Sequence, residues 1–357
     1  MSAGNAGDTV PRVFSVPVGR PFIACFIESF LSGRLFDRGP LSADELADAC
    51  IFVPTRRAGD ALLAGLATAT GGRARFLPRT IALGDDEAFA DVLGADLLPA
   101  GRDAERPAIG EFDRRMFLFS LVETWRTATA SQRPDAGGGE PFHVGESCAD
   151  AFALAGDLAR LIDETIIEDV PLARLAEAMP DSYDPARHDS YWTITQQFLQ
   201  IATRHWPEVL DEIGMCDAAD RLKQHVRALA THVSIAGSKG PVVVAGSTGS
   251  VTATAELMAA IARLPMGAVV LPGLDTTLDD AAWSLIGAER ASLTTRYAHA
   301  QTQLKRTLGQ IGIAREAVRR LAAPTGRERL VSEIMRPAEA TADWRATRPL
   351  VAADPAT

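Results

Sequence analysis

Hydrophobic residues follow two different periods along this chain, and the change from one to the other marks its elements. Short runs that are almost continuously apolar occur at residues 13–17, 49–53, 241–245 and 267–273. Such runs are typical of parallel strands that helices cover on both faces. A turn follows each run, and apolar positions spaced three or four residues apart come next. This order predicts repeated strand–loop–helix units.

The helices expected after these strands begin at recognisable signals. Residues 22–31 are rich in apolar side chains and follow a turn that ends in Pro21. Residues 56–66 follow Thr55, whose hydroxyl is a plausible N-cap, and residues 253–263 follow a run of small polar residues. Consecutive units of this kind imply a parallel sheet.

The middle of the chain has a different pattern. From about residue 108 to 230 there is no strand signal, and apolar positions recur at helical spacing. The helices expected there span residues 113–129, 147–164, 191–214 and 218–231. Breaks in the pattern are expected at residues 132–141, which include three consecutive glycines, and at residues 180–185.

We therefore predict an α/β fold in which a parallel sheet is flanked by helices and carries a large all-helical insertion. The predicted parts are a tail at residues 1–12, the first part of the core at 13–110, the insertion at 111–235, the return of the core at 236–300 and a helical connector at 301–357.

Composition narrows the classes of protein that fit this pattern. With 357 residues and 47% hydrophobic content, the chain can bury a large core. No apolar run reaches the roughly 20 residues that cross a bilayer, and the first residues lack the features of a secretory signal. The net charge of −10 opposes autonomous binding to a polyanion, so contacts with nucleic acid must come from local arginines or from a partner.

The four cysteines are far apart in the sequence and show no spacing typical of a zinc site or a disulfide framework. A reduced, cytoplasmic setting fits this usage.

The first loop is where a phosphate-binding loop would lie in a nucleotide-binding α/β domain. It contains Gly19 and Arg20 but neither the lysine nor the Ser/Thr of a P-loop, and Pro21 removes one backbone donor. The loop after the third apolar run, Gly246-Ser247-Thr248-Gly249, is similar to a dinucleotide-binding loop, although its third glycine and its acidic partner are missing. A tight strand-to-helix turn is the simpler interpretation of this second loop.

A basic group follows the second strand. Thr55, Arg56 and Arg57 open a helix, where backbone donors, the helix dipole and guanidinium groups can converge on a phosphate. Arg79 and Thr80 extend this basic region, so all five residues are candidate contacts to a DNA backbone. The alternative is that the arginines are the solvated start of an amphipathic helix.

Two further groups carry weaker signals. Asp275, Asp279 and Asp280 could hold a divalent cation, but an acidic loop that caps the following helix is the better interpretation. The six histidines form no pattern that pairs a nucleophile with a base or binds a metal, so no catalytic residue and no metal site is predicted.

Several stretches carry a resemblance to a known family. They are Phe14–Phe22, Phe52–Ala58, Ala245–Leu257, Gly267–Trp283 and Leu330–Glu339, and they occur in the expected order over most of residues 13–345. This chain resembles the front part of alphaproteobacterial AddB proteins, the non-motor subunits of a helicase-nuclease that processes DNA double-strand breaks for homologous recombination.

The resemblance implies a degenerate superfamily 1 helicase-like fold that pairs with the AddA motor subunit as a heterodimer and contacts DNA through the complex, away from membranes. It implies no cofactor in this chain, because the iron-sulfur cluster and Mg²⁺ of the family belong to a C-terminal half that these residues do not match. Two alternatives stay open, a small-molecule or nucleotide-binding enzyme that uses Gly246–Ser250, and a remnant without activity of its own.

Overall fold

The computed structural model describes residues 10–71, 76–93, 106–131, 147–172, 174 and 194–341. The chain divides into two compact units. The first is formed by Met1–Leu98 and His225–Thr357, and the second by Pro99–Gln224. The second unit is therefore continuous in sequence, whereas the first is assembled from both ends of the chain.

The first unit is built on a six-stranded sheet in which every pair of neighbouring strands is parallel. Its strands are β1 (Val13–Val16), β2 (Cys50–Val53), β3 (Arg79–Ala82), β4 (Val242–Ala245), β5 (Gly267–Pro272) and β6 (Arg319–Arg320). Their order in the sheet is β3-β2-β4-β5-β1-β6. The predicted α/β class with a parallel sheet is confirmed, and the two edge strands β3 and β6 are additions to the four strands predicted from the sequence.

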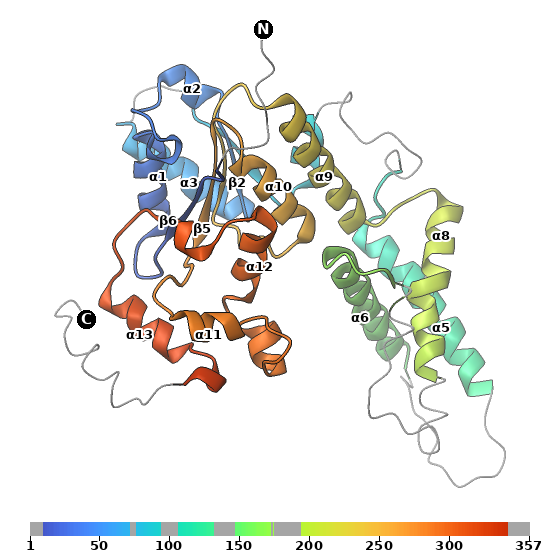
Figure 1. Cartoon of the computed structure of the whole chain (residues 1–357). Helices are drawn as coiled ribbons and strands as arrows, with labels where there is room; N and C mark the ends of the chain where they lie inside the picture. The colour runs from blue at the N-terminus through green and yellow to red at the C-terminus, as the bar shows by residue number, and fades with distance from the viewer. Residues whose placement is uncertain are drawn as a thin grey trace. The chain divides into compact units, whose positions relative to one another are not determined.

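The helices of this unit cover both faces of the sheet (Figure 1). They are α1 (Phe22–Leu31), α2 (Ala43–Ala47), α3 (Arg56–Ala69), α4 (Asp86–Leu93), α10 (Thr252–Ala262), α11 (Asp280–Leu285), α12 (Thr302–Ile311) and α13 (Gly326–Ile334). The predicted helix at residues 22–31 has the same ends in the structure.

Strand order decides which face each helix covers. The chain moves toward β3 after β1 and β2, and in the opposite direction after β4 and β5. Because crossover connections are right-handed, helices that follow strands in opposite directions lie on opposite faces. One core cluster accordingly joins α1 and α3 to alternate residues of the strands, such as Phe14, Val16, Ile51 and Val243. Helix α10 packs on β4 and β5 from the other face.

The second unit is helical. Its described elements include α5 (Glu111–Ser131), α6 (Cys148–Ile167), α8 (Trp206–Ile213) and the start of α9 (Ala218–Ala236), which runs on into the first unit. A π-helical turn at Ile201–His205 lies within the helix expected at residues 191–214. The fully buried Leu118, Leu158 and Trp206 form the centre of its core. The expected breaks at residues 132–141 and 180–185 lie outside the described residues.

No helix among the described residues is both long enough and apolar enough to cross a membrane.

Candidate functional site at the carboxyl end of the sheet

The candidate loops lie together at the carboxyl end of the sheet. Since all strands are parallel, the turns that contain Gly19, Thr55 and Gly246 all leave the carboxyl ends of their strands. Strands β1 and β5 are neighbours, and the helices that follow them leave in opposite directions. In open α/β sheets, ligands bind in the crevice at such a switch point, so the carboxyl end of the sheet is the natural candidate site.

The turn after β1 is closed by the loop that precedes α13. A Cβ atom added at Gly19 would collide with the Thr325 hydroxyl oxygen, so any larger residue would force the turn or Thr325 to shift. The Arg20 Nε donates to the Ala323 carbonyl oxygen at 3.2 Å, and the Arg20 backbone N–H donates to the Pro17 carbonyl at 3.0 Å. These contacts use the groups that a phosphate-binding loop would offer to its ligand.

The turn after β4 is closed by α12. Gly246 and Gly249 have positive φ angles of 82° and 67°, which favour glycine. The Thr307 hydroxyl donates to the Thr248 carbonyl at 2.7 Å, and the Ser247 hydroxyl accepts from the Gly249 N–H at 3.2 Å. A side chain of α12 and one of the turn's own hydroxyls thus fill the space where a nucleotide would approach the backbone.

The turn after β2 is different because it faces solvent. The Thr55 hydroxyl caps α3 by accepting from the Ala58 N–H at 3.2 Å, as its sequence position predicts. Arg56 forms an exposed ion pair with Asp85 at 2.8 Å, and this partner holds the pKa of the Asp85 carboxyl below its usual range. Arg57 is exposed and has no ionic partner among the described residues. This turn therefore offers one helix start and two exposed guanidinium groups.

Arg79 and Thr80 lie at the other end of the sheet. Arg79 begins β3 and pairs in register with Cys50, the first residue of β2, whereas Thr55–Arg57 follow the last residue of β2. Arg79 is exposed, and Thr80 packs beside Gly59 of α3. The five candidate DNA contacts therefore do not form one cluster: Thr55, Arg56 and Arg57 follow the carboxyl end of β2, whereas Arg79 and Thr80 lie at the start of β3.

The acidic group after β5 is occupied by structural contacts. Asp275 accepts from the backbone N–H groups of Thr277 and Leu278 at 2.8 and 3.0 Å. Asp279 caps α11 by accepting from the Ala282 N–H, and Asp280 pairs with Arg315 at 2.6 Å. Among the described residues, no cluster of three or more His, Cys, Asp or Glu side chains could hold a metal ion. The capping interpretation of this loop therefore agrees with its geometry.

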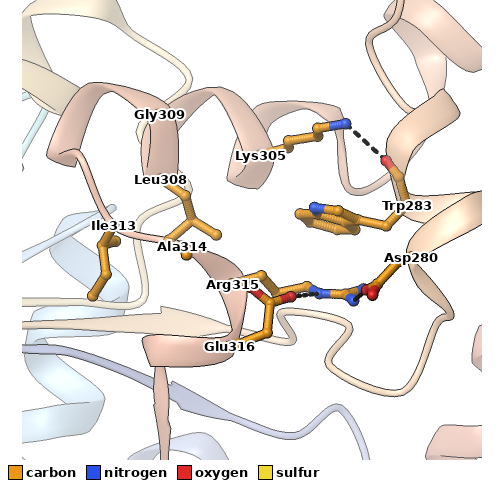
Figure 2. Close-up of a pocket in the computed structure, with 9 residues that line it drawn as sticks. All are labelled: Asp280, Trp283, Lys305, Leu308, Gly309, Ile313, Ala314, Arg315 and Glu316. Carbon is orange, nitrogen blue, oxygen red and sulfur yellow. Dashed lines mark hydrogen bonds and ion pairs between the residues drawn. The ribbon is translucent and has the colours of Figure 1, made fainter.

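A shallow pocket of about 440 Å³ lies beside α11 and α12 (Figure 2). The Trp283 ring lies between Lys305 and Arg315, at 5.5 Å from the Lys305 Nζ and 4.8 Å from the Arg315 guanidinium carbon. Lys305 donates to the carbonyls of Trp283 and Ile286 at the end of α11, and burial lowers its pKa. Arg315 donates to the Leu278 carbonyl. Both cations thus hold α11 in place, which favours a structural role for this pocket.

Titratable groups elsewhere are bound into the fold as well. His225 is buried, with its Nδ1 2.6 Å from the Asp86 carboxylate, and the exposed His205 lies 3.4 Å from Glu208. His143 and His188 lie outside the described residues. All four cysteines are free thiols, and burial raises the pKa of the Cys50 thiol to about 12.

Sequence reasoning missed the residues that close the turns. The Thr307 hydroxyl donates to the carbonyls of Thr248 and Gly249, which lie 59 and 58 residues before it in the sequence. The Ala323 carbonyl accepts from Arg20, which lies 303 residues before it. No local pattern marks such positions, because a single threonine or alanine carries no periodic signal. Only the strand order brings them to the loops.

No protein-family model matches this chain, and a search of curated proteins finds no match.

Proposed function

We propose that this chain is the helicase-like, non-catalytic module of an AddB-type subunit, which binds a motor subunit of the AddA type and guides broken DNA ends in a cytoplasmic helicase-nuclease. Its ordered likeness to AddB proteins over most of residues 13–345 motivates the proposal. A parallel α/β sheet with two closed turns at its carboxyl end is compatible with it.

The observation that carries the proposal is the state of the two turns where a motor would hold its nucleotide. A motor needs backbone donors and a lysine for the phosphates, and acidic residues that hold magnesium. In this chain the turn after β1 contacts Thr325 and Ala323, and the turn after β4 is filled by Thr307. Neither turn contains a lysine or a carboxylate. This geometry favours a nucleotide site that has lost its function over an active one.

The turn after β2 supports the DNA-guiding part of the proposal. Its helix start and the exposed Arg56 and Arg57 suit a phosphate of the DNA backbone, since helix N-termini and guanidinium groups both favour anions. In the proposed assembly, Arg57 contacts the backbone directly and Arg56 exchanges Asp85 for phosphate. Arg79 and Thr80, at the start of β3, would belong to a separate contact.

Binding to the motor subunit tests the proposal most directly. The full chain and a purified AddA-type motor subunit are mixed in low salt and separated by size-exclusion chromatography. We expect a stoichiometric complex and no ATP turnover by the chain alone. A chain that elutes separately from the motor subunit, or that hydrolyses ATP in a way that Thr307→Val changes, would contradict the proposal.

Arg57→Ala tests the DNA contact within the complex. We expect weaker binding to DNA and a smaller dependence of affinity on salt, by roughly one released counterion. Arg160→Ala is a matched control because Arg160 is also an exposed helix arginine, with a side-chain exposure of 75%. Equal effects of the two substitutions would remove Arg57 from the proposed contact.

A further inference from the structure

Exposed arginines from four parts of the α/β unit lie around the loop that joins β6 to α13 (Figure 1). These parts are the turn after β1, the 3₁₀-helix η1 (Arg34–Phe36), β6 and the start of α13. The residues, which we call the arginine cluster, are Arg20, Arg34, Arg320, Arg327 and Arg329. None of them forms an ion pair with a carboxylate among the described residues.

The loop after β6 holds two of these arginines by its backbone carbonyls. Arg34 donates to the carbonyls of Arg320 and Leu321, both at 3.0 Å. Arg20 donates from its Nε to the Ala323 carbonyl at 3.2 Å. Since these carbonyls belong to one short stretch of backbone, the guanidinium groups of Arg20 and Arg34 are fixed on the same loop.

Arg320, at the end of β6, is held in a similar way. It donates to the Thr276 hydroxyl at 2.6 Å and to the Thr276 carbonyl at 3.1 Å. A guanidinium group has several N–H donors, and each of Arg20, Arg34 and Arg320 uses only one or two of them on neutral acceptors. These contacts position the groups without neutralising their charge, and N–H donors remain for a further acceptor.

The carboxylates near the arginine cluster have other contacts. Asp37, which follows η1, pairs with Arg319 and Arg12. Asp275 accepts from backbone N–H groups of its own loop. Glu328 is only 5% exposed, and burial raises the pKa of its carboxyl. Among the described residues, these acidic groups therefore do not form surface ion pairs with the cluster.

The first turn of α13 carries the other two arginines. Arg327 and Arg329 are exposed and follow the N-cap Thr325, and neither side chain donates a hydrogen bond within the described residues. A cation near the start of a helix is unfavourable, because the helix dipole is positive there. An anion in front of α13 would be favoured by the dipole and by both guanidinium groups. The helix alone does not account for this pair of arginines.

We infer that the arginine cluster is a binding site for the phosphodiester backbone of a nucleic acid. Guanidinium groups donate in a planar fork that matches phosphate oxygens, and a strand supplies negative charges at short, regular intervals. Because the whole chain has a net charge of −10, a contact with a polyanion must come from a local group of this kind.

The arginine cluster would be a second DNA contact, beside the turn after β2. The choice of a nucleic acid over an acidic peptide rests on the proposed function. Carboxylates also fit a guanidinium fork, so the experiment has to compare the two kinds of polyanion directly.

The test is binding of the full chain to a fluorescently labelled oligothymidine strand, measured by anisotropy over a range of salt concentrations. The main probe is the double variant Arg327→Ala, Arg329→Ala, because these side chains hold no other described segment in place. We expect weaker binding and a slope of log affinity against log salt that is shallower by about 1.4, or about 0.7 for each lost phosphate contact. The variant Arg327→Lys, Arg329→Lys keeps both charges and should keep the slope.

Two controls separate the arginine cluster from net charge and from general attraction of anions. The variant Arg160→Ala, Arg204→Ala removes the same charge from the helical unit, where these side chains are 75% and 70% exposed, and should leave the slope unchanged. Polyglutamate, added at the same concentration of charge, should displace the labelled strand much less than unlabelled oligothymidine does.

The outcomes also separate this inference from the proposed function. The inference is overturned if the natural chain does not bind the strand at low salt, or if Arg327→Ala, Arg329→Ala keeps the natural slope. Equal losses in the two double alanine variants, or equal competition by polyglutamate, would overturn it as well. A chain that forms the complex with the motor subunit in any of these cases would keep the proposed function and lose only the arginine cluster as a contact.

Discussion

The two units of the chain hold their cores together by different means. In the α/β unit, aliphatic and phenylalanine side chains such as Ile51, Val243 and Phe26 fill the space between sheet and helices. In the helical unit, Arg114 lies 2.8 Å from Asp163 and 2.8 Å from Asp217, and the Trp206 N–H donates to Asp217 at 3.0 Å. The core cluster between the sheet and α1 and α3 consists of apolar side chains, whereas the core of the helical unit is joined by directional polar contacts.

Sequence pattern explains this difference. Strands covered on both faces and their helices have continuous apolar surfaces, so their packing is specified by shape and hydrophobicity. Helix α5 has a less regular pattern, and Phe112, Met116 and Phe117 on it are exposed. Arg114 fixes α5 against α6 and the start of α9, because its charge must meet both carboxylates. The buried contacts of Arg114 with Asp163 and Asp217 thus fix the position of α5 against its neighbours.

The largest effect is expected from Arg114→Ala. Removing one member of a buried ion pair leaves the other charge unpaired, which costs about 3 to 5 kcal/mol. Chemical denaturation followed by circular dichroism would show the loss, and hydrogen exchange would place it in α5, α6 and α8. Arg160→Ala, an exposed arginine of the same unit, should change stability by less than about 1 kcal/mol. Similar losses for the two variants would contradict the contrast.

Asp217→Asn should change how stability depends on pH. Burial raises the pKa of the Asp217 carboxyl above 3.8, against the opposing effect of Arg114. The folded state then binds more protons than the unfolded state above pH 3.8, so this group makes stability fall as pH rises through that region, by at most about 1.4 kcal/mol per pH unit. Denaturation at several pH values should show this slope in the natural chain and not in the variant. A slope shared by both proteins would assign it to another group.

Ile51→Val tests the apolar core. Ile51 is completely buried in β2, so deleting one methyl group should cost about 0.5 to 1.5 kcal/mol without any dependence on pH. Thermal denaturation at pH 5 and pH 8 would measure it. A loss that differs between the two pH values would show that the core of the α/β unit is coupled to titratable groups after all.

The smallest effect is expected from Arg56→Ala. Its ion pair with Asp85 is exposed, with 75% of the arginine side chain accessible, so the loss should be about 0.2 to 1 kcal/mol and should shrink in high salt. Denaturation at low and high salt would show this trend. An effect as large as that of Arg114→Ala would mean that the start of α3 supports the fold rather than offering a free anion site.

Local elements were largely predictable from the sequence, and the candidate site was predictable only in part. The strands at β1, β2, β4 and β5 and the cap at Thr55 follow from apolar runs and capping preferences. The closure of the turn after β4 does not, because Thr307 reaches Thr248 from a helix 59 residues along the chain. The position of Arg79 was likewise hidden, since its strand begins with two polar residues.

By itself the sequence determined the alternation of strands and helices in the α/β unit. It also determined that the turns after β1 and β4 contain no lysine and no carboxylate. Both properties depend only on residues that are neighbours in the chain. Only the tertiary structure decided the strand order, the edge strands β3 and β6, and which side chains fill the turns. The physical reason is that apolar periodicity acts over a few residues, whereas strand pairing and loop closure are hydrogen bonds and packing between segments that are distant in the chain.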